Sequence, residues 1–209
     1  MRNEGLSSLV AEVLQKGMTA GIGKALACKC AEQGLNVVLV ARPDDLMDAI
    51  DKELPARYPE VEFRMVPVDL STKGYVRQVS DAVKDIIVQV CFLNAGYIQT
   101  GFFVKTTLEK NYANLECNVG HVVGLSHMLI NHLQDAGRPG CLVFTSSAAA
   151  VMPAPFASLY NSTKAFLSAF GSSIAAEVRQ YDSRLFQFVE TSILGVLKAC
   201  MWADDLFAF

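Results

Sequence analysis

Short apolar runs alternate with helical stretches along most of this 209-residue chain, and this alternation constrains its fold more than any other feature. The run LNVVLVAR is β-branched and nearly continuous, as expected of a strand that is buried on both faces. Strands that alternate with helices at this spacing indicate βαβ units. The sequence therefore predicts one α/β domain over residues 1–209, with a doubly wound parallel sheet and helices on both faces. The predicted strands span 35–42, 61–70, 86–96, 140–147 and 183–196, and the predicted helices span 23–34, 44–59, 107–135 and 160–179.

Charge and hydropathy exclude several classes of partner. The 18 Lys and Arg residues against 21 Asp and Glu give a net charge of −3 with no block of like charge, so we expect no nucleic-acid partner. No apolar run reaches the roughly 18 residues of a membrane span, and Glu4 leaves too short an apolar stretch for a secretory signal. A composition that is 52% hydrophobic indicates either a heavily buried sheet or surfaces that a partner covers.

The cysteines and histidines show no spacing typical of metal ligands. The cysteines stand mostly in apolar stretches without a CxxC pair, and the histidines share one helical segment. We expect buried thiols in a reducing, intracellular compartment and no metal site, with the cytoplasm and an organelle membrane surface both left open. The cysteines are Cys28, Cys30, Cys91, Cys117, Cys141 and Cys200, and the histidines are His121, His127 and His132.

A glycine-rich stretch, KGMTAGIGKALA, covers residues 16–27 at the start of the first predicted helix. Gly17, Gly21 and Gly23 permit a tight turn and a close approach of backbone to a pyrophosphate at the positive end of that helix. Their spacing differs from the common G-x-G-x-x-G fingerprint, and a glycine-rich turn entering a helix is often only a turn. The βαβ context favours a dinucleotide site.

Arg42 follows the next strand, at the position where a side chain that reads the adenosine ribose is expected. A carboxylate there would accept hydrogen bonds from a 2′-hydroxyl and repel a 2′-phosphate, whereas a guanidinium attracts the phosphate. Arg42 therefore favours NADP(H) over NAD(H) if a dinucleotide binds. The alternative is an exposed arginine that ends a strand.

The segment SLYNSTKAF, residues 158–166, places Tyr160 and Lys164 four positions apart on a predicted helix, where their head groups are neighbours. One interpretation is a solvated surface pair. The other is a tyrosine whose pKa of about 10 is lowered by the nearby cation, so that it exchanges protons near neutral pH. The spacing alone does not separate the two interpretations.

The order of three motifs resembles the short-chain dehydrogenase/reductase family. These motifs are the glycine loop, the sequence Leu93-Asn94-Ala95-Gly96 and the Tyr160-x-x-x-Lys164 pair. The family's loop is T-G-x-x-x-G-x-G, and residues 16–23 match it except that Lys16 replaces Thr. The segment VMPAPFASLYNSTKAF is similar to the branch of ketoacyl-CoA reductases and hydroxysteroid dehydrogenases. The resemblance covers roughly residues 16–182, and the ordered combination is more specific than any single motif.

The resemblance implies a catalytic set for carbonyl reduction or alcohol oxidation. Tyr160 would be the general acid and base, and Lys164 would favour its phenolate and hydrogen-bond the nicotinamide ribose. Ser147, thirteen residues before the tyrosine, would bind the substrate oxygen in preference to Ser146. Asn118, midway along the preceding long helix, would hold a water that relays protons towards Lys164.

The resemblance also implies an NADP(H) site, in which Asp69 matches the family's acidic residue on the adenine side. The substrate would be a hydrophobic, lipid-like or steroid-like carbonyl or alcohol. Helices 107–135 and 160–180 would pair across the interface of a dimer or tetramer. The cofactor-binding residues implied by the resemblance are Gly17, Thr19, Gly21, Ile22, Gly23, Arg42, Asp69, Asn94, Ala95, Gly96, Tyr160 and Lys164.

The two ends of the chain depart from the family. The family's first strand leads into the glycine loop, but here the apolar residues before it follow the spacing of an amphipathic helix. As the family's first strand, this segment would place Glu12 inside a strand that is buried on both faces. One alternative is a short strand, with Glu12 displaced to a sheet edge or paired with a partner. The other is that this segment is not the family's first strand. The apolar positions are Leu6, Leu9, Val10, Val13 and Leu14.

At the other end the family expects a Pro-Gly pair, a loop that covers the substrate, more helix and a final strand. This chain reads VETSILGVLKACMWADDLFAF, and no proline follows Pro155. The resemblance therefore implies a fold without the family's final strand and substrate loop. The sheet edge left open would be shielded by oligomerisation or by another subunit.

Two functions follow from these motifs. The first is an NADP(H)-dependent oxidoreductase that interconverts a ketone and a secondary alcohol, which the complete catalytic set favours. The second is a weak or inactive relative that serves as a structural or cofactor-binding subunit, which Lys16 and the divergent C-terminal end favour. An enzyme should oxidise NADPH when offered ketones, whereas a structural subunit should not.

Overall fold

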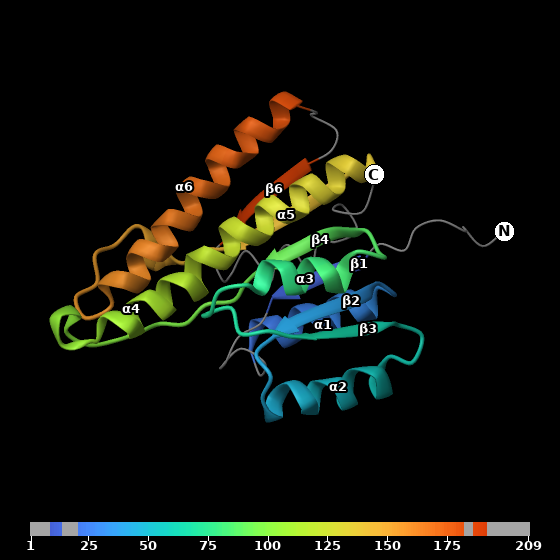
Figure 1. The fold of residues 1–209 in the computed structure, drawn as a ribbon, viewed down its shortest axis with the longest axis horizontal. Helices are drawn as coiled ribbons and strands as arrows, with labels where there is room; N and C mark the ends of the chain where they lie inside the picture. The colour runs from blue at the N-terminus through green and yellow to red at the C-terminus, as the bar shows by residue number, and fades with distance from the viewer. Residues whose placement is uncertain (1–8, 14–20, 182–185, 192–209) are drawn as a thin grey trace.

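The computed structural model describes residues 9–13, 21–181 and 186–191, with side chains from residue 21 to residue 178. Its strands form one six-stranded sheet in the order β3-β2-β1-β4-β5-β6, and all neighbouring strands are parallel (Figure 1). The strands are β1 (Leu9–Val13), β2 (Asn36–Ala41), β3 (Phe63–Pro67), β4 (Val88–Leu93), β5 (Gly140–Thr145) and β6 (Phe186–Thr191). The helices are α1 (Ile22–Glu32), α2 (Asp45–Arg57), α3 (Tyr75–Val83), α4 (Leu108–Leu115), α5 (His121–Ala136) and α6 (Ser158–Tyr181), with the short helical segments η1 (Phe103–Lys105), η2 (Glu116–Gly120) and η3 (Ala148–Ala150).

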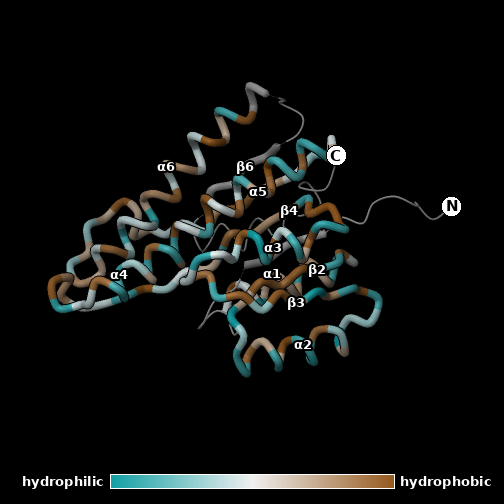
Figure 2. Tube along the Cα trace, viewed as in Figure 1, coloured by the Kyte–Doolittle hydropathy of each residue, from teal (hydrophilic) through white to brown (hydrophobic). Residues whose placement is uncertain are grey.

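Each face of the sheet is covered by its own set of helices, so the predicted doubly wound α/β fold is confirmed. Strand β2 shows why, because Val37 and Leu39 pack into the core beneath α1 and α2. The alternate residues Val38 and Val40 pack into the core formed with α3, α5 and α6. Both faces of the strand are apolar, which accounts for its nearly continuous hydrophobic sequence. Figure 2 shows β2 as largely hydrophobic, whereas α2 alternates between hydrophobic and hydrophilic residues.

The five predicted strands are all present, with β3 and β4 shorter than predicted. The N-terminal ambiguity is decided in favour of a strand, because β1 lies at the centre of the sheet between β2 and β4. The backbone of Glu12 pairs in register with Leu39 on one side and Phe92 on the other, so Glu12 is not at a sheet edge. Two neighbouring strands offer β1 backbone partners along its length, and this tertiary pairing overrides the local helical pattern.

The predicted helices are also present, and the structure adds α3, which the sequence analysis did not assign. The predicted helix 107–135 is α4, η2 and α5 in succession, and η2 is a turn of π-helix. Helix α2 is capped by Asp44, whose side chain accepts hydrogen bonds from the backbone N–H groups of Leu46 and Met47. None of the described helices combines the length and the hydropathy needed to cross a membrane.

The strand order reverses between β1 and β4, and this reversal positions the site. In an open parallel sheet the loops on either side of the reversal diverge, which leaves a crevice beyond the carboxyl ends of the strands. The segments that leave β4 and β5 there begin with Asn94 and Ser146. These are the segments that carry several of the predicted site residues.

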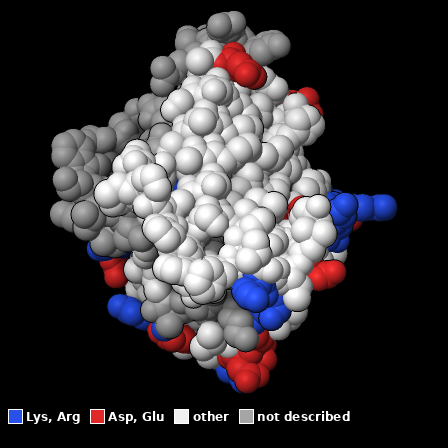
Figure 3. Space-filling view, turned by 90° about the vertical axis from the view of Figure 1, so that its left-hand side faces the viewer, with Lys and Arg blue, Asp and Glu red and all other residues white. Residues whose placement is uncertain are grey.

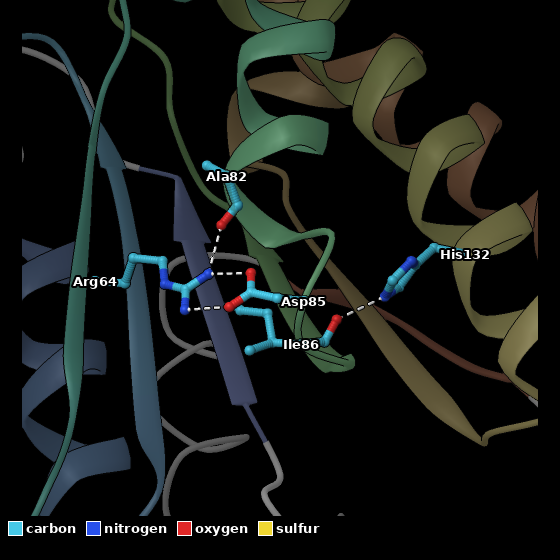
Figure 4. Close-up of polar contacts among 5 residues, drawn as sticks. All are labelled: Arg64, Ala82, Asp85, Ile86 and His132. Carbon is cyan, nitrogen blue, oxygen red and sulfur yellow. Dashed lines mark hydrogen bonds and ion pairs between the residues drawn. The ribbon is translucent and has the colours of Figure 1, made fainter.

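The opposite end of the sheet is fastened by polar contacts to the loop that precedes β4 (Figure 4). Arg64 on β3 donates to both carboxylate oxygens of Asp85, at 2.6 and 2.9 Å, and to the carbonyl oxygen of Ala82. These hydrogen bonds lower the pKa of Asp85 to about 2. His132 on α5 donates from Nε2 to the carbonyl oxygen of Ile86 at 2.9 Å. The loop before β4 is therefore hydrogen-bonded both to the sheet, through Arg64, and to α5, through His132.

Candidate active site

Lys164 is the most deeply embedded charge of the site. Its side chain is only 4% exposed, and its Nζ donates to the backbone carbonyl oxygen of Thr145, the last residue of β5, at 2.6 Å. Burial lowers the pKa of Lys164 to about 8, because a charged ammonium is poorly solvated there. The same Nζ lies 5.7 Å from the centre of the Tyr160 ring. The structure thus brings Tyr160 and Lys164 together at the end of the sheet.

The two adjacent serines after β5 have different surroundings. Ser146 is buried against α6, where its hydroxyl donates to the carbonyl oxygen of Lys164 at 3.2 Å and lies 2.8 Å from the hydroxyl of Ser168. Ser147 is half-buried, and its hydroxyl accepts a hydrogen bond from the backbone N–H of Ala149 at the start of η3. The Ser147 hydroxyl keeps its own proton to donate, which suits it to contact a substrate oxygen.

Asn118 lies in the π-helical turn η2 and is fully buried. Its Oδ1 accepts from the backbone N–H of Tyr97 at 2.9 Å, and its Nδ2 donates to the Tyr97 carbonyl oxygen at 3.0 Å. The Nδ2 also donates to the hydroxyl of Thr163 on α6 at 3.2 Å. An amide NH₂ has two protons, so these contacts use both donors. The Asn118 side chain therefore joins the segment after β4 to the helix that carries Tyr160.

The backbone at Gly96 packs closely against two polar side chains of the site. A Cβ added to Gly96 would lie 3.2 Å from Oδ1 of Asn118 and 3.8 Å from Nζ of Lys164. Asn94 is buried, yet both polar atoms of its side chain lack a hydrogen-bond partner in the structure, as does the hydroxyl of Thr145. Buried polar groups are normally satisfied. These unpaired atoms at the crevice fit the polar groups of a dinucleotide.

The glycine loop is described from Gly21 onward, and Gly17 and Thr19 lie outside the described residues. Gly21 is the N-cap of α1 and Gly23 is buried within its first turn, next to Ile22. No side chain caps this helix, and no acidic residue stands in its first turn. Among the described residues, nothing therefore competes with an anion for the backbone N–H groups at the positive end of this helix.

Arg42 and Asp69 lie just beyond β2 and β3. Arg42 is half-buried, and its Nη2 lies 3.6 Å from Oδ2 of Asp44. A carboxylate thus stands beside the guanidinium that was predicted to read the 2′-phosphate. Asp69 accepts hydrogen bonds through Oδ1 from the backbone N–H and the hydroxyl of Ser71, which fixes its carboxylate at the start of the next loop.

Sequence reasoning missed three residues that hold this site together. Asn114 is fully buried and donates to the Tyr97 carbonyl oxygen at 3.0 Å, and Asn111 accepts from the side chain of Gln99 at 2.9 Å. Thr163, also buried, donates to the carbonyl oxygen of Tyr160 at 2.7 Å. The signal was present in the sequence, because 111, 114 and 118 follow the i, i+3, i+7 spacing of one helix face.

The remaining cysteines and histidines contribute no site among the described residues. Within that part of the chain no group of three His, Cys, Asp or Glu side chains could hold a metal ion. Among the described residues, Cys28, Cys117 and Cys141 are free thiols. Burial raises the pKa of Cys117 to about 12 and lowers that of His121 to about 3, so both are uncharged near neutral pH.

Comparisons with known proteins place this chain in a family. The family described as short chain dehydrogenase matches residues 12–193. The very-long-chain 3-oxoacyl-CoA reductase of Schizosaccharomyces pombe is 33% identical over 175 residues, covering 78% of this chain and 51% of that protein. The 17-beta-hydroxysteroid dehydrogenase type 3 of Mus musculus is 28% identical over 166 residues, covering 78% and 53%. The chain spans about half the length of the curated relatives that it matches.

Solved structures share the same fold. The L-sorbose reductase from Gluconobacter frateurii, complexed with NADPH and L-sorbose, superposes with a TM-score of 0.74 at 30% identity, covering 84% of this chain and 66% of that chain. A short-chain dehydrogenase from Sphingobium yanoikuyae, in complex with NADPH, gives a TM-score of 0.80 at 21% identity, covering 95% and 85%. The predicted family and branch are thereby confirmed: the chain belongs to the short-chain dehydrogenase family and is similar to its ketoacyl-CoA reductase and hydroxysteroid dehydrogenase members.

Proposed function

We propose that this protein is an NADP(H)-dependent oxidoreductase that interconverts a ketone and a secondary alcohol on a hydrophobic substrate. The observation that carries the proposal is the position of Lys164. Its ammonium is buried, is hydrogen-bonded to the carbonyl oxygen of Thr145, and lies beside both the Tyr160 ring and the backbone of Gly96. A buried cation next to a phenol is costly to maintain for stability alone, and it suits a site where negative charge develops on oxygen.

In this proposal the dinucleotide lies across the reversal in strand order. The start of α1, with Gly21, Ile22 and Gly23, receives the pyrophosphate, and Gly17 and Thr19, which lie outside the described residues, would complete this part of the site. The unpaired side-chain atoms of Asn94, with the backbone of Ala95 and Gly96, support placing the nicotinamide half beside Lys164. Asp69 borders the adenine side.

Arg42 supports the choice of NADP(H) over NAD(H). Its guanidinium stands just after β2, where the adenosine ribose of a dinucleotide is expected. Asp44 lies 3.6 Å from it and reduces the net positive charge offered to a 2′-phosphate. Asp44 therefore weakens the proposed preference for NADP(H). Substitutions at Arg42 and at Asp44 should change the ratio of NADPH to NADH affinity in opposite directions.

Side chains of this protein transfer the proton and orient the substrate. When bound, the nicotinamide supplies a hydride to the carbonyl carbon or takes one from the alcohol carbon. Tyr160 donates a proton to the carbonyl oxygen during reduction and accepts it during oxidation. The Ser147 hydroxyl donates to the same oxygen, and the Lys164 ammonium stabilises negative charge on the phenol oxygen. Asn118 holds the Tyr97 segment, and a water beside it would pass protons towards Lys164.

A hydrophobic substrate agrees with the surface around the site. Figure 3 looks onto the end of the molecule where α4 and the start of α6 lie, and uncharged side chains fill most of that face. Exposed apolar residues of this region come from the segments after β4 and β5. Two relatives are named for very-long-chain oxoacyl-CoA and for hydroxysteroid substrates. The exposed apolar residues are Ile98, Phe102, Phe103, Val104, Leu108, Tyr112, Val151, Met152 and Phe156.

We also propose a homo-oligomer that forms through α5 and α6, in a reducing, intracellular compartment. Val123 on α5 and Phe166 on α6 are exposed large hydrophobic residues, as expected of helices that pack on a second copy. The free thiols of Cys28, Cys117 and Cys141 agree with a reducing compartment. Light scattering on the purified chain tests the assembly directly.

Thermal unfolding with NADPH, with NADH and without a cofactor tests the cofactor assignment. Binding to the folded state at about 100 times the dissociation constant adds roughly 2.7 kcal/mol of stability, which is an easily measured rise in Tm. We expect a larger rise with NADPH than with NADH, followed by ketone-dependent oxidation of NADPH. A folded chain whose Tm neither cofactor raises would favour the structural-subunit alternative.

A further inference from the structure

Asn118 stands in the π-helical turn η2, and the geometry of that turn sets the direction of its amide. The turn closes across five residues, because the backbone N–H of His121 donates to the carbonyl oxygen of Glu116. An α-helical turn would close after four residues and would present Asn118 in a different direction. Single π-turns inside helices are rare, so the contacts that hold this one in place bear on the site.

One side of η2 is hydrogen-bonded to α3. Tyr75, the first residue of α3, is only 4% exposed, and its hydroxyl donates to Oε1 of Glu116 at 2.6 Å. Burial, together with the neighbouring carboxylate, raises the pKa of Tyr75, so the hydroxyl keeps the proton that it donates. Hydrogen bonds to a charged acceptor are among the stronger ones in proteins. This bond joins the first residue of η2 to a helix 41 residues earlier in the chain.

Two glycines leave the room that this contact requires. A Cβ added to Gly120 would lie 2.7 Å from Cδ and Oε1 of Glu116, so the carboxylate occupies the space over Gly120. A Cβ added to Gly124, one turn later, would lie 2.7 Å from Cγ2 of Val76. Helix α3 therefore packs closely enough on α5 for Tyr75 to reach the π-turn (Figure 1). A side chain at position 120 would displace the Glu116 carboxylate from its place beside Tyr75.

We propose that Tyr75 and Glu116 are positioning residues for Asn118, because their hydrogen bond holds η2 in the π-helical form that places the Asn118 amide against Tyr97. Residues two apart on a helix point to different sides, so η2 offers Glu116 to α3 and Asn118 to the segment after β4. Tyr75 and Glu116 thus act through Asn118. The inference rests on the proposed function, since it names the residues that keep the proposed proton-relay asparagine in place.

Amide hydrogen exchange at Tyr97 tests the proposal without requiring turnover, because the Tyr97 N–H donates to Oδ1 of Asn118 at 2.9 Å. Tyr75→Phe keeps the ring and removes the hydroxyl. We expect it to speed this exchange by roughly tenfold, as loss of a hydrogen bond to a charged group predicts. Tyr58→Phe is the matched control, because Tyr58 also donates to a glutamate, Glu32 at 3.3 Å, on the other face of the sheet. Unchanged exchange in Tyr75→Phe, or an equal change in Tyr58→Phe, would overturn the proposal.

Two further substitutions separate positioning from a general loss of stability. Gly120→Ala adds helix propensity and displaces the Glu116 carboxylate, so we expect faster exchange at Tyr97 without a lower Tm. Glu116→Gln keeps an acceptor oxygen for the Tyr75 hydroxyl and should preserve the slow exchange, whereas Glu116→Leu should not. Exchange that stays slow in Gly120→Ala, or that is equally fast in Glu116→Gln and Glu116→Leu, would show that this contact does not hold the turn.

Ketone reduction tests the consequence for catalysis. We expect kcat to fall by roughly tenfold in Tyr75→Phe, with KM for the ketone and Kd for NADPH unchanged, because the proposed relay is affected and the binding surfaces are not. Glu116→Gln should keep the kcat of the wild type. An unchanged kcat in Tyr75→Phe, or a matching rise in KM and Kd, would overturn the positioning role. If the wild type reduces no ketone, the proposed function fails, and the exchange at Tyr97 alone decides whether Tyr75 and Glu116 position Asn118.

Discussion

The ammonium of Lys164 donates a hydrogen bond to the backbone carbonyl oxygen of Thr145 at 2.6 Å. Lys164 lies one helical turn after Tyr160, so this contact joins that part of α6 to the end of β5. This contact fixes the first turn of α6 against the sheet. Two neighbours in the same turn add to it: Thr163 contacts Asn118, and Asn161 donates to the carbonyl oxygen of Met152 at 2.6 Å. The Tyr160 ring is thereby positioned by its helix, and its hydroxyl is left for chemistry.

Tyr160→Phe removes the proposed proton donor and keeps the ring that lies beside Lys164. We expect ketone reduction to fall by about 10²- to 10⁴-fold, the usual contribution of a general acid. NADPH affinity and Tm should stay close to those of the wild type, because the ring is retained. Turnover that survives the substitution undiminished would show that another group delivers the proton.

The lowered pKa of Lys164 makes stability depend on pH. The pKa is 10.5 in an ordinary environment and about 8 in the folded protein. Between these values the unfolded chain keeps the proton that the folded protein has lost, so the free energy of unfolding rises with pH. Below pH 8 both states are protonated and the full cost of the buried charge is present.

We therefore expect the stability of the wild type, relative to Lys164→Met, to increase by up to about 3 kcal/mol as pH rises from 7 to 10. Urea unfolding of both proteins at several pH values measures the difference. The comparison with Lys164→Met removes the contributions of all other titrating groups. Parallel curves for the two proteins would mean that Lys164 has an ordinary pKa.

Arg42→Asp replaces a cation beside the proposed 2′-phosphate site with a carboxylate. We expect NADPH to bind at least about tenfold more weakly and NADH more tightly, because the carboxylate repels the phosphate and accepts hydrogen bonds from a ribose hydroxyl. Titration calorimetry with both cofactors measures the change. The same affinity ratio before and after the substitution would contradict the role of Arg42.

Asp44→Asn tests the opposing carboxylate. Asparagine still caps α2, where Asp44 accepts from Leu46 and Met47, so the helix should be retained. Removing the negative charge 3.6 Å from Arg42 should strengthen NADPH binding by roughly two- to fivefold at low salt. NADH affinity should change little, and an equal gain for both cofactors would argue against an effect on the 2′-phosphate.

Thr163→Val leaves the Asn118 amide without one of its acceptors inside the protein. We expect a loss of about 1–3 kcal/mol in the free energy of unfolding, the usual cost of an unpaired buried polar group, and a lower kcat. Thr163→Ser is the matched control, since it keeps the hydroxyl that bonds both Asn118 and the Tyr160 carbonyl oxygen. Equal losses in the two variants would point to packing of the methyl group instead.

Much of the fold was predictable because its signals are local. The nearly continuous apolar run at 35–42 indicates a doubly buried strand, and β2 has alternate residues in two separate cores. The spacing of Tyr160 and Lys164 needs only helical geometry to bring their side chains together. The choice of Ser147 over Ser146 came from the family resemblance, and the different surroundings of the two hydroxyls agree with it.

Other features required the tertiary structure. The segment before the glycine loop has the pattern of a helix, and it becomes β1 only because β2 and β4 pair with it on both sides. Asn111 and Asn114 on α4 read as ordinary helix polar residues until the segment after β4 is placed against them. The same applies to Asp44, whose effect on Arg42 depends on where the cap of α2 lies.

The sequence by itself determined the α/β architecture and the spacing of the Tyr160–Lys164 pair, because both follow from local periodicities and their order along the chain. The tertiary structure alone decided which strand is central, how deeply Lys164 is buried and which residues hold the Tyr97 segment. Each of these depends on a hydrogen bond or a loss of solvent between segments far apart in the chain. Such contacts produce no periodic pattern in the sequence of either segment.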